Sequence, residues 1–279
     1  MLTVIIVNYN GALFIKKCLD SVMHQLAHMP HMKIIVIDNA STDASLDCIA
    51  PYESNITLIK NTVNVGFPAA HNQILDQLST PYLWLLNNDT EFSHATDLVS
   101  PIIDYFEANP STVGLSPKLL NTDGTLQAQG SGFSRWVFNT NKTRAVRFLS
   151  GASLFIRTSF FKSIQGFDPQ LFFYNDDIDF AMQAKKHKKK LIYFPSLEVT
   201  HHGGLSTAFN PISTQIGGYF GSVYLCKKYY PRLIFYLYFL LVWLLITLKK
   251  GYYMCMKTDA SSEWVTELTH LQQRLAHDI

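Results

Sequence analysis

Charged residues are scarce in this sequence. Asp, Glu, Lys and Arg make up 16% of its 279 residues, against roughly 25% in typical soluble domains. Apolar residues make up 48%. The chain is long enough for one large or two small domains with a sizeable buried core. Because its charged fraction is lower than that of a typical soluble domain, we expect part of the chain to contact lipid.

Cysteines are few and scattered. The four are Cys18, Cys48, Cys226 and Cys255, with no C-x-x-C pair and no dense framework. This pattern fits a reducing compartment. The opening run Leu2–Val7 has no basic residues before it and no small-residue cleavage site. We therefore expect no signal peptide and a protein that stays on the cytoplasmic side.

Several well-known motifs are missing. The sequence has no zinc-ligand spacing, no P-loop and no G-x-G-x-x-G, which argues against a zinc hydrolase, a P-loop ATPase and a dinucleotide oxidoreductase. It shows no internal repeat and no low-complexity segment. Its net charge is only +2, without an aromatic-interleaved basic motif, so nucleic acid is not an expected partner.

Short β-branched runs alternate with helical stretches over the first 90 residues. The expected strands are Leu2–Val7, Lys33–Ile37, Ile56–Ile59 and Tyr82–Leu86, and the expected helices are Leu13–Gln25, Ser45–Ile49 and Ala69–Leu78. This alternation predicts an α/β fold with a parallel sheet covered by helices on both faces. A further strand is expected at Leu149–Ile156, in a second half that closes over the sheet edge.

Polar residues follow each expected strand. The strand ends are Asn8-Tyr9-Asn10, Asp38-Asn39-Ala40-Ser41, the stretch from Asn61 to Gly66, and Asn87-Asn88-Asp89. Ligands of such sheets bind outside the carboxyl ends of the strands, so a site is expected along one edge. Asp38 could accept a hydrogen bond from a pyrimidine imide or a ribose hydroxyl, or could simply be a cap. Asp89 and its two amide neighbours could help bind Mg²⁺ or Mn²⁺ beside a diphosphate, with a plain turn as the alternative.

Three carboxylates stand within four residues at Asp176-Asp177-Ile178-Asp179. They begin an expected helix over Asp176–His187, where free N–H groups and the macrodipole favour negative charge. Helix capping is the simpler interpretation. Downstream, His201-His202 precede Gly203-Gly204, which places imidazoles where the backbone can approach another group closely. Together the clusters could supply a general base, a metal-binding carboxylate and an imidazole ligand.

The distribution of charge along the chain is uneven. Residues 1–131 carry 5 Lys/Arg against 12 Asp/Glu, and residues 132–210 carry 11 against 5. The basic stretch suggests an anionic lipid surface or a pyrophosphate-bearing acceptor, with a solvated face as the alternative.

The C-terminal part differs in composition from the rest. Leu233–Leu248 is an uncharged apolar run flanked by basic residues, and spanning a bilayer takes about 20 apolar residues. We expect a helix in or just under the cytoplasmic interface rather than a span. The domain prediction is residues 1–120, residues 121–210 of the same domain, and a membrane-associated helical tail over residues 211–279.

The motifs in combination resemble glycosyltransferase family 2, and within it the rhamnosyltransferase-like branch. The resemblance covers roughly residues 1–210. The matching segments are Val7 to Gly11, Val36 to Asp43, Asn64 to Phe67 with Asn72, Leu85 to Asp89, Ser150 to Ala152, Gly166 to Asp168, Phe172 to Asp179, and His201 to Ser206.

The resemblance implies a GT-A fold, a mostly parallel central sheet flanked by helices, and it implies roles for single residues. Asp177 would be the general base, supported by Asp176 and Asp179. Asp89 would hold the divalent cation, Mg²⁺ or Mn²⁺, and His201 would bind the cation or the diphosphate. The nucleotide-sugar would be bound by Asn8, Asn10, Asp38, Gly66, Asn72 and Asn88.

The implied reaction is inverting, metal-dependent transfer of a sugar, for example rhamnose, from a dTDP- or UDP-sugar. The acceptor would be a lipid-linked saccharide or a polysaccharide in cell-surface glycan synthesis, at the cytoplasmic face of the membrane, with a peripheral or single-pass anchor. One alternative is a sugar nucleotidyltransferase, although Asn8 to Gly11 lacks the basic phosphate loop that it would need. Another is a non-catalytic membrane-bound scaffold, because Asn87 replaces the first Asp of the usual metal motif and Gln183 stands where an Arg is common.

Overall fold

Nine strands form one sheet in the part of the chain that the computed structural model describes, which is residues 1–93, 96–127, 129, 135–203, 211–256 and 258–278. The strands are β1 Leu2–Asn8, β2 Lys33–Asp38, β3 Thr57–Lys60, β4 Tyr82–Asn87, β5 Thr90–Glu91, β6 Thr112–Leu120, β7 Arg144–Val146, β8 Ser153–Arg157 and β9 Lys190–His201.

The α-helices are α1 Ile15–Gln25, α2 Ser45–Ile49, α3 Phe67–Asn72, α4 Ser100–Ala108, α5 Arg135–Phe138, α6 Thr158–Ser163, α7 Asp176–Lys186, α9 Pro211–Tyr229, α10 Arg232–Met256 and α11 Asp259–Asp278. Contacts divide the chain into two compact units. The sheet unit comprises Met1–Phe172 and Asp176–Gly203, and the helical unit comprises Phe173–Asn175 and Gly204–Ile279.

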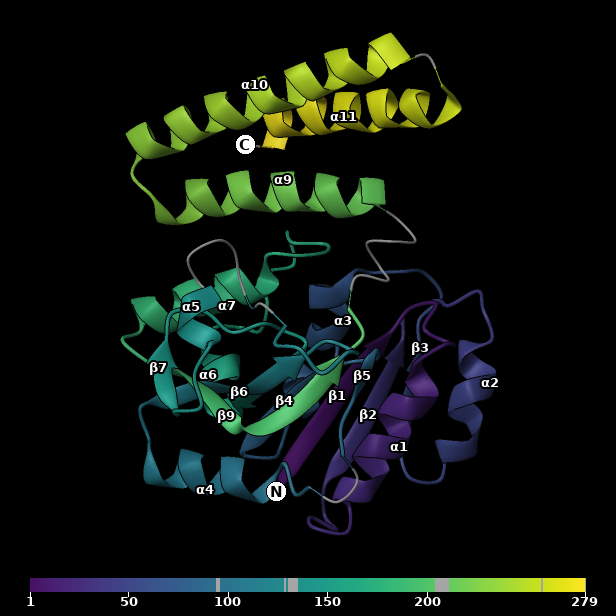
Figure 1. The fold of residues 1–279 in the computed structure, drawn as a ribbon, viewed down its shortest axis with the longest axis vertical. Helices are drawn as coiled ribbons and strands as arrows, with labels where there is room; N and C mark the ends of the chain where they lie inside the picture. The colour runs from purple at the N-terminus through teal and green to yellow at the C-terminus, as the bar shows by residue number, and fades with distance from the viewer. Residues whose placement is uncertain (94–95, 128, 130–134, 204–210, 257, 279) are drawn as a thin grey trace. The chain divides into compact units, whose positions relative to one another are not determined.

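The sheet has the strand order β3-β2-β1-β4-β8-β6-β9-β5, with β7 paired to β9 (Figure 1). Its first four strands are parallel. Strand β8 runs antiparallel to both of its neighbours, and β6 and β9 are again parallel. The predicted α/β architecture is confirmed, and the sheet is mixed rather than uniformly parallel.

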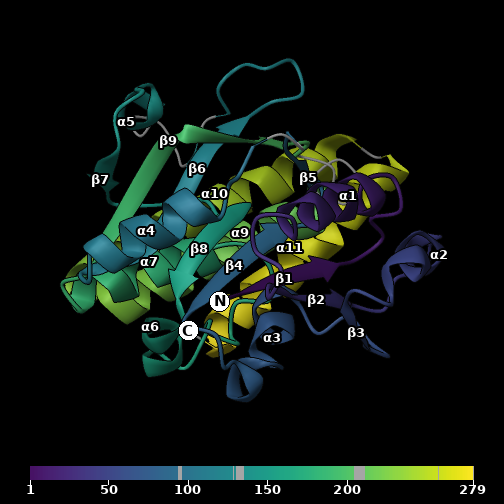
Figure 2. The same ribbon diagram turned by 90° about the horizontal axis from the view of Figure 1, so that it is seen from below.

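Helices cover both faces of the sheet (Figure 2). Along β1, Leu2, Val4 and Ile6 pack in the cluster that includes α1 and α4, whereas Ile5 and Val7 pack in the cluster that includes α3, α6 and α7. Side chains alternate between the faces of a strand, so a strand buried on both sides is apolar throughout. This explains why β1 is one continuous buried run.

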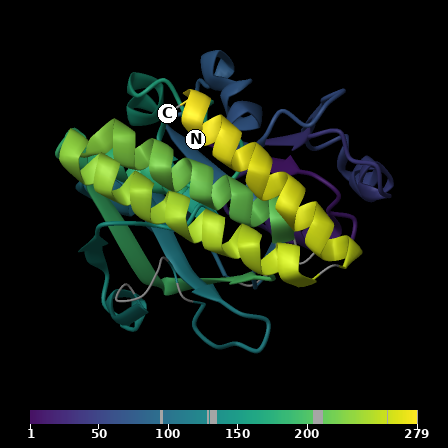
Figure 3. The same ribbon diagram turned by 90° about the horizontal axis from the view of Figure 1, so that it is seen from above.

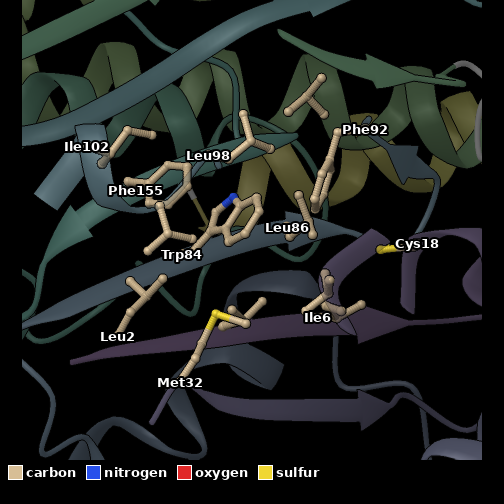
Figure 4. Close-up of a cluster of buried hydrophobic side chains, with 14 of the residues drawn as sticks. Leu2, Ile6, Cys18, Met32, Trp84, Leu86, Phe92, Leu98, Ile102 and Phe155 are labelled. Carbon is tan, nitrogen blue, oxygen red and sulfur yellow. The ribbon is translucent and has the colours of Figure 1, made fainter. Parts of the chain in front are cut away.

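A large aromatic pair fills the face that packs on α1 and α4 (Figure 4). The rings of Trp84 and Phe155 stack with their centroids 4.5 Å apart. The buried indole N–H of Trp84 donates to Ser153 Oγ at 3.0 Å, so its one polar atom is paired. The contact joins neighbouring strands β4 and β8 and fixes the antiparallel part of the sheet to the parallel part.

Two sequence-based boundaries were wrong. The single helix expected at Ala69–Leu78 is α3 followed by a separate 3₁₀ turn at Leu75–Gln77, because Pro68 starts the helix early. The strand expected from Leu149 begins only at Ser153. The preceding backbone bonds to side chains instead of a strand: Ser150 N donates to Gln129 Oε1 and Gly151 N to Asp177 Oδ2.

The helical unit has its own core. Helices α9, α10 and α11 share one apolar cluster (Figure 3). Its buried members are Phe220, Val223, Cys226, Phe235, Val242, Ile246, Leu268, Leu271 and Leu275. Within the described residues, α10 is the one helix long and apolar enough to cross a membrane by length and composition.

Candidate active site

The polar ends of β1, β2 and β4 lie at one edge of the sheet. The parallel registers pair Asn8 with Asp38 and Val7 with Asn87. Carboxyl ends of neighbouring parallel strands meet at the same edge, where α/β folds bind their ligands. The sheet itself therefore gathers the predicted site residues that follow β1, β2 and β4.

Asn8, Asp38, Ser41 and Asn88 form what we call the strand-end amide network. Asn8 Nδ2 donates to Asp38 Oδ1 at 2.9 Å, and Asn88 Nδ2 donates to Asn8 Oδ1 at 2.7 Å. Ser41 donates twice to Asp38, from its hydroxyl at 2.6 Å and from its backbone N–H at 3.0 Å. Asp38 is only 2% exposed and already accepts three hydrogen bonds, which leaves about one acceptor position of its carboxylate open to a ligand.

The turn after β1 depends on backbone conformation. Asn10 adopts a left-handed φ of 49°, its N–H donates to Ser41 Oγ at 3.0 Å, and its side-chain oxygen accepts from Thr42 N at 2.8 Å. A Cβ at Gly11 would lie 2.1 Å from Asn88 Nδ2. Only glycine fits at position 11 while Asn88 keeps its hydrogen bond to Asn8.

Gly66 and Asn72 flank helix α3. Gly66 has a φ of 86°, and a Cβ there would lie 2.6 Å from the carbonyl oxygen of Phe172. The amide of Asn72 holds the backbone of Phe167 from both sides, donating to its oxygen at 2.7 Å and accepting from its N–H at 2.9 Å. That these two residues contact the nucleotide stays a prediction. In the structure, the side chain of Asn72 fixes the backbone of the loop before α7.

Asp89 and His201 face each other across a short strand pairing. Asp89 sits in the turn between β4 and β5, and Thr90 of β5 pairs with His201 of β9. Asp89 Oδ1 lies 3.2 Å from His201 Nε2, and both side chains are mostly buried, with 14% and 16% exposed. The amide of Asn87 also approaches this ring nitrogen, at 3.3 Å.

Gln127 determines which nitrogen of His201 carries the hydrogen. Gln127 Nε2 donates to Asn121 Oδ1 at 3.2 Å and to the His201 carbonyl at 3.0 Å, which turns its oxygen toward His201 Nδ1 at 2.7 Å. Nδ1 must therefore be the donor, and in the neutral ring Nε2 presents its lone pair to Asp89.

The chemistry of this donor set fits a divalent cation. Two acceptor atoms, Nε2 of His201 and Oδ1 of Asp89, lie 3.2 Å apart, a separation that suits two ligands of one hard cation at roughly 2.1 Å each. No cluster of three or more His, Cys, Asp or Glu side chains suited to a metal occurs among the described residues. A cation here would take its remaining ligands from outside the protein.

Asp177 is the second residue of α7 and is half-buried. Its Oδ1 accepts from Ile178 N at 2.8 Å and its Oδ2 from Gly151 N at a longer 3.4 Å. Burial raises the pKa of Asp177 to about 6, and the backbone donors lower it only in part. A carboxylate with a pKa near neutral is suited to accept a proton.

Asp176 and Asp179 lie deeper, at 6% and 3% exposed. Burial raises the pKa of Asp176, and the charges of Asp177 and Asp179 raise it further. Asp176 therefore favours its neutral form at a pH where Asp177 is ionised, so the first turn of α7 does not carry three full charges.

A short backbone bridge connects Asp177 with the metal-compatible pair. Asn87 N donates to the Ala152 carbonyl at 2.9 Å, and the neighbouring Gly151 N bonds to Asp177. The predicted base and the strand end that carries Asp89 thus meet at the same sheet edge. Sequence reasoning left out Gln127, Ser41 and Gly151. Gly151 lay within a matching motif and was not assigned a role, and nothing in the sequence marks Gln127.

Comparison with known proteins agrees with this geometry. The model of "Glycosyl transferase family 2" matches residues 3–165. The "N-acetylglucosaminyl-diphospho-decaprenol L-rhamnosyltransferase" of Mycobacterium tuberculosis is 24% identical over 246 residues, covering 76% of this chain and 80% of that protein.

Two solved structures share the fold. The mannosyltransferase PcManGT from Pyrobaculum calidifontis, in complex with GDP-Man and Mn²⁺, superposes with a TM-score of 0.62 at 15% identity, over 99% of this chain and 87% of that one. S. aureus TarS 1-349 in complex with UDP-GlcNAc gives 0.62 at 17% identity, over 98% and 81%. In the complex with UDP, the matched region is 64% of that chain.

The GT-A fold that the sequence resemblance implied is confirmed by these structures. The family match covers more than half of the sequence and includes β1, β2 and β4, whose ends build the site. The chain therefore belongs to glycosyl transferase family 2.

Proposed function

We propose that this enzyme transfers a sugar, with inversion, from a nucleotide-diphosphate donor to a hydroxyl of a lipid-linked saccharide or polysaccharide in cell-surface glycan synthesis. The observation that carries the proposal is the position of Asp177, whose Gly151 contact adjoins the backbone bond to Asn87 at the end of β4. The similarity to a protein named as an L-rhamnosyltransferase of a decaprenol-linked sugar supports a lipid-linked acceptor and rhamnose as the transferred sugar. Structural relatives were solved with UDP, UDP-GlcNAc or GDP-Man.

Asp177 is the general base in this proposal. Its carboxylate removes the proton of the acceptor hydroxyl as that oxygen attacks the anomeric carbon, on the face opposite the leaving diphosphate. Inversion needs one such base, and its raised pKa strengthens its basicity. Ile178 N and Gly151 N hold the carboxylate in place. Asp176, neutral beside it, avoids a second charge that would repel the donor diphosphate.

Asp89 and His201 would hold Mg²⁺ or Mn²⁺, with diphosphate oxygens completing the coordination. When bound, the cation stabilises the negative charge that grows on the leaving diphosphate. Gln127 keeps the His201 lone pair directed toward Asp89. The single carboxylate in the motif, with Asn87 at its first position, makes the cation dependent on the donor for tight binding.

The strand-end amide network would bind the nucleotide. Its internal hydrogen bonds fix Asn8 and Asn88 before the donor arrives, so these side chains lose little conformational entropy on binding. The remaining acceptor position of Asp38 would take the imide N–H of the base, with Asn10 and Gly66 lining the turns beside it. Residues 1–120 would thus serve the donor, 121–210 the acceptor and the chemistry, and 211–279 the cytoplasmic face of the membrane.

The test is Asp177→Asn in the full chain, assayed for transfer and, separately, for donor binding by thermal shift with Mn²⁺. We expect transfer to fall about 10²- to 10⁴-fold, the usual worth of a general base, with donor binding nearly unchanged. The exposed acid Asp104 on α4 provides the matched control, since Asp104→Asn should change neither. Unchanged turnover in Asp177→Asn would remove Asp177 as the base. Release of pyrophosphate instead of nucleotide diphosphate would indicate a nucleotidyltransferase, and no release a scaffold.

A further inference from the structure

Helix α10 carries most of the exposed large apolar side chains of the described chain. On one stripe of the helix, Leu237, Leu240, Leu241, Leu244 and Leu248 are 53–62% exposed. These positions recur at the three- and four-residue spacing that places side chains on one face of a helix. A continuous apolar stripe of this length is unusual on a surface that meets only water.

The opposite face of α10 is packed within the helical unit. Phe235, Val242 and Ile246 are 7%, 3% and 0% exposed and belong to the cluster shared with α9 and α11. Thr247 also accepts a hydrogen bond from Gln272 of α11 at 2.9 Å. Helix α10 is therefore one member of a packed group of three helices (Figure 3), and it does not stand alone.

Its partner α11 is unsuited to hydrocarbon. The residues Glu263, Glu267, His270, Arg274 and His277 lie along α11, and of these Glu263, His270, Arg274 and His277 are exposed. Charged side chains at the centre of a bilayer are costly and are rarely left facing lipid. If α10 crossed the bilayer while packed on α11, these groups would enter it as well. The packing argues that α10 lies parallel to the membrane plane, because only then does α11 stay in water.

Charge supports the same orientation. Residues 211–256 contain five Lys or Arg and no Asp or Glu. The basic residues flank the apolar stripe: Lys227, Lys228 and Arg232 come before it, and Lys249 and Lys250 follow it. All four acids of residues 211–279 lie from Asp259 onward, in α11. An anionic bilayer attracts basic groups that flank an interfacial helix.

We propose that α10 docks in the plane of an anionic lipid bilayer, with its leucine stripe buried at the boundary of headgroups and acyl chains, and does not span it. The apolar stripe enters to a depth of about 5–10 Å. The exposed bases Lys227, Lys228 and Arg232 meet anionic headgroups, whereas the ammonium of Lys249 lies over the Trp264 ring of α11. This inference does not rest on the transfer reaction, because vesicle binding needs neither donor nor acceptor. A chain that binds vesicles but transfers no sugar would contradict the proposed function alone.

The first experiment measures flotation of the full chain with vesicles of 30% phosphatidylglycerol and 70% phosphatidylcholine. The variant L237Q/L240Q/L241Q/L244Q should bind at least about tenfold more weakly, since each buried leucine contributes to partitioning. A matched control, S262Q/T266Q/A276Q, changes exposed positions of α11 and should bind like the wild type. Pure phosphatidylcholine vesicles should bind the wild type less. Thermal unfolding of each variant confirms that it folds.

The second experiment separates lying in the plane from spanning. Fluorophores on single cysteines at positions 233, 240 and 248 are quenched by brominated lipids of known depth, in a background with Cys48→Ser and Cys255→Ser. The other two cysteines are buried and should not label. We expect equal depths at the three positions. A deep centre with shallow ends would show a span. Failure to bind vesicles, with a wild-type dimer that the leucine variant converts to a monomer, would show that a second copy covers the stripe. Either result would overturn the proposal.

Discussion

The strand-end amide network and the Asp89–His201 pair lie at the same sheet edge, yet they differ in how fully their polar atoms are hydrogen-bonded within the protein. In the network, Asp38 is 2% exposed and accepts three hydrogen bonds from Asn8 and Ser41. In the pair, Asp89 faces Nε2 of His201, which carries no hydrogen when the ring is neutral, because Gln127 accepts from Nδ1.

The Asp177 carboxylate belongs with the second group. It has one good backbone donor and one long one, and its pKa is raised by burial. Satisfied polar networks stiffen a protein, whereas groups left electrostatically unsatisfied are stabilised only when a substrate or cation arrives. The edge is therefore divided into a rigid part, the strand-end amide network, and a part whose polar groups are less fully paired within the protein.

Three tests follow: Gln127→Leu, a change of pH, and Asn8→Ala. We expect the largest effect from Gln127→Leu, which removes the hydrogen bond that orients His201. Gln127→Leu removes the acceptor that holds Nδ1–H, so Nε2 no longer presents its lone pair to the cation reliably. We expect Mn²⁺ affinity to fall about 10- to 100-fold, as for other residues that orient a metal-binding histidine. Calorimetry or electron paramagnetic resonance with the protein, MnCl₂ and a saturating nucleoside diphosphate measures this affinity without any turnover.

Asn121→Ala is the matched control for this change. Asn121 bonds to the other end of the same Gln127 amide, at 3.2 Å, and Gln127 keeps its bond to the His201 carbonyl in that variant. Mn²⁺ affinity should then change much less. Equal losses in both variants would mean that Gln127 acts only through the fold.

The pH dependence of kcat/KM and of stability tests whether Asp177 belongs with the less fully paired groups. Since its pKa is raised to about 6, kcat/KM should fall about tenfold per pH unit below that value, because the base must be deprotonated. The free energy of unfolding should instead fall as pH rises. A carboxyl with a raised folded pKa contributes stability that is fully present below the unfolded value and is lost as pH rises through the folded pKa. Rates and denaturation curves between about pH 4.5 and 8 measure both. A profile flat down to pH 5, roughly one unit below the pKa, would contradict the assignment.

Damage to the amide network should affect stability more than chemistry. Asn8→Ala leaves Asp38 without one donor and Asn88 without its acceptor, so we expect a loss of about 1–3 kcal/mol in the free energy of unfolding. Urea denaturation measures this loss. Asn55→Ala, at an exposed turn position, serves as the control and should cost little. If Asn8→Ala left stability intact but abolished transfer, Asn8 would belong with the reactive groups instead.

The sequence predicts the sheet edge because each strand is a short apolar run that ends in polar residues. Asn8, Asp38 and Asn87 stand at the ends of such buried runs, and the parallel registers bring them together. It does not predict Gln127, because that side chain reaches His201 across 74 residues by a contact with no local pattern. The late start of β8 also escapes prediction, since Gly151 bonds to a side chain 26 residues away.

The pairing of the two-residue strand β5 with the end of β9 has a consequence for biosynthesis. Asn87 and His201 are 114 residues apart in sequence, and closing so long a loop is among the slower steps of folding. During translation, β1, β2 and β4, whose ends build the strand-end amide network, leave the ribosome well before β9 does. The Asp89–His201 pair needs β9, so a growing chain should form the network before the pair.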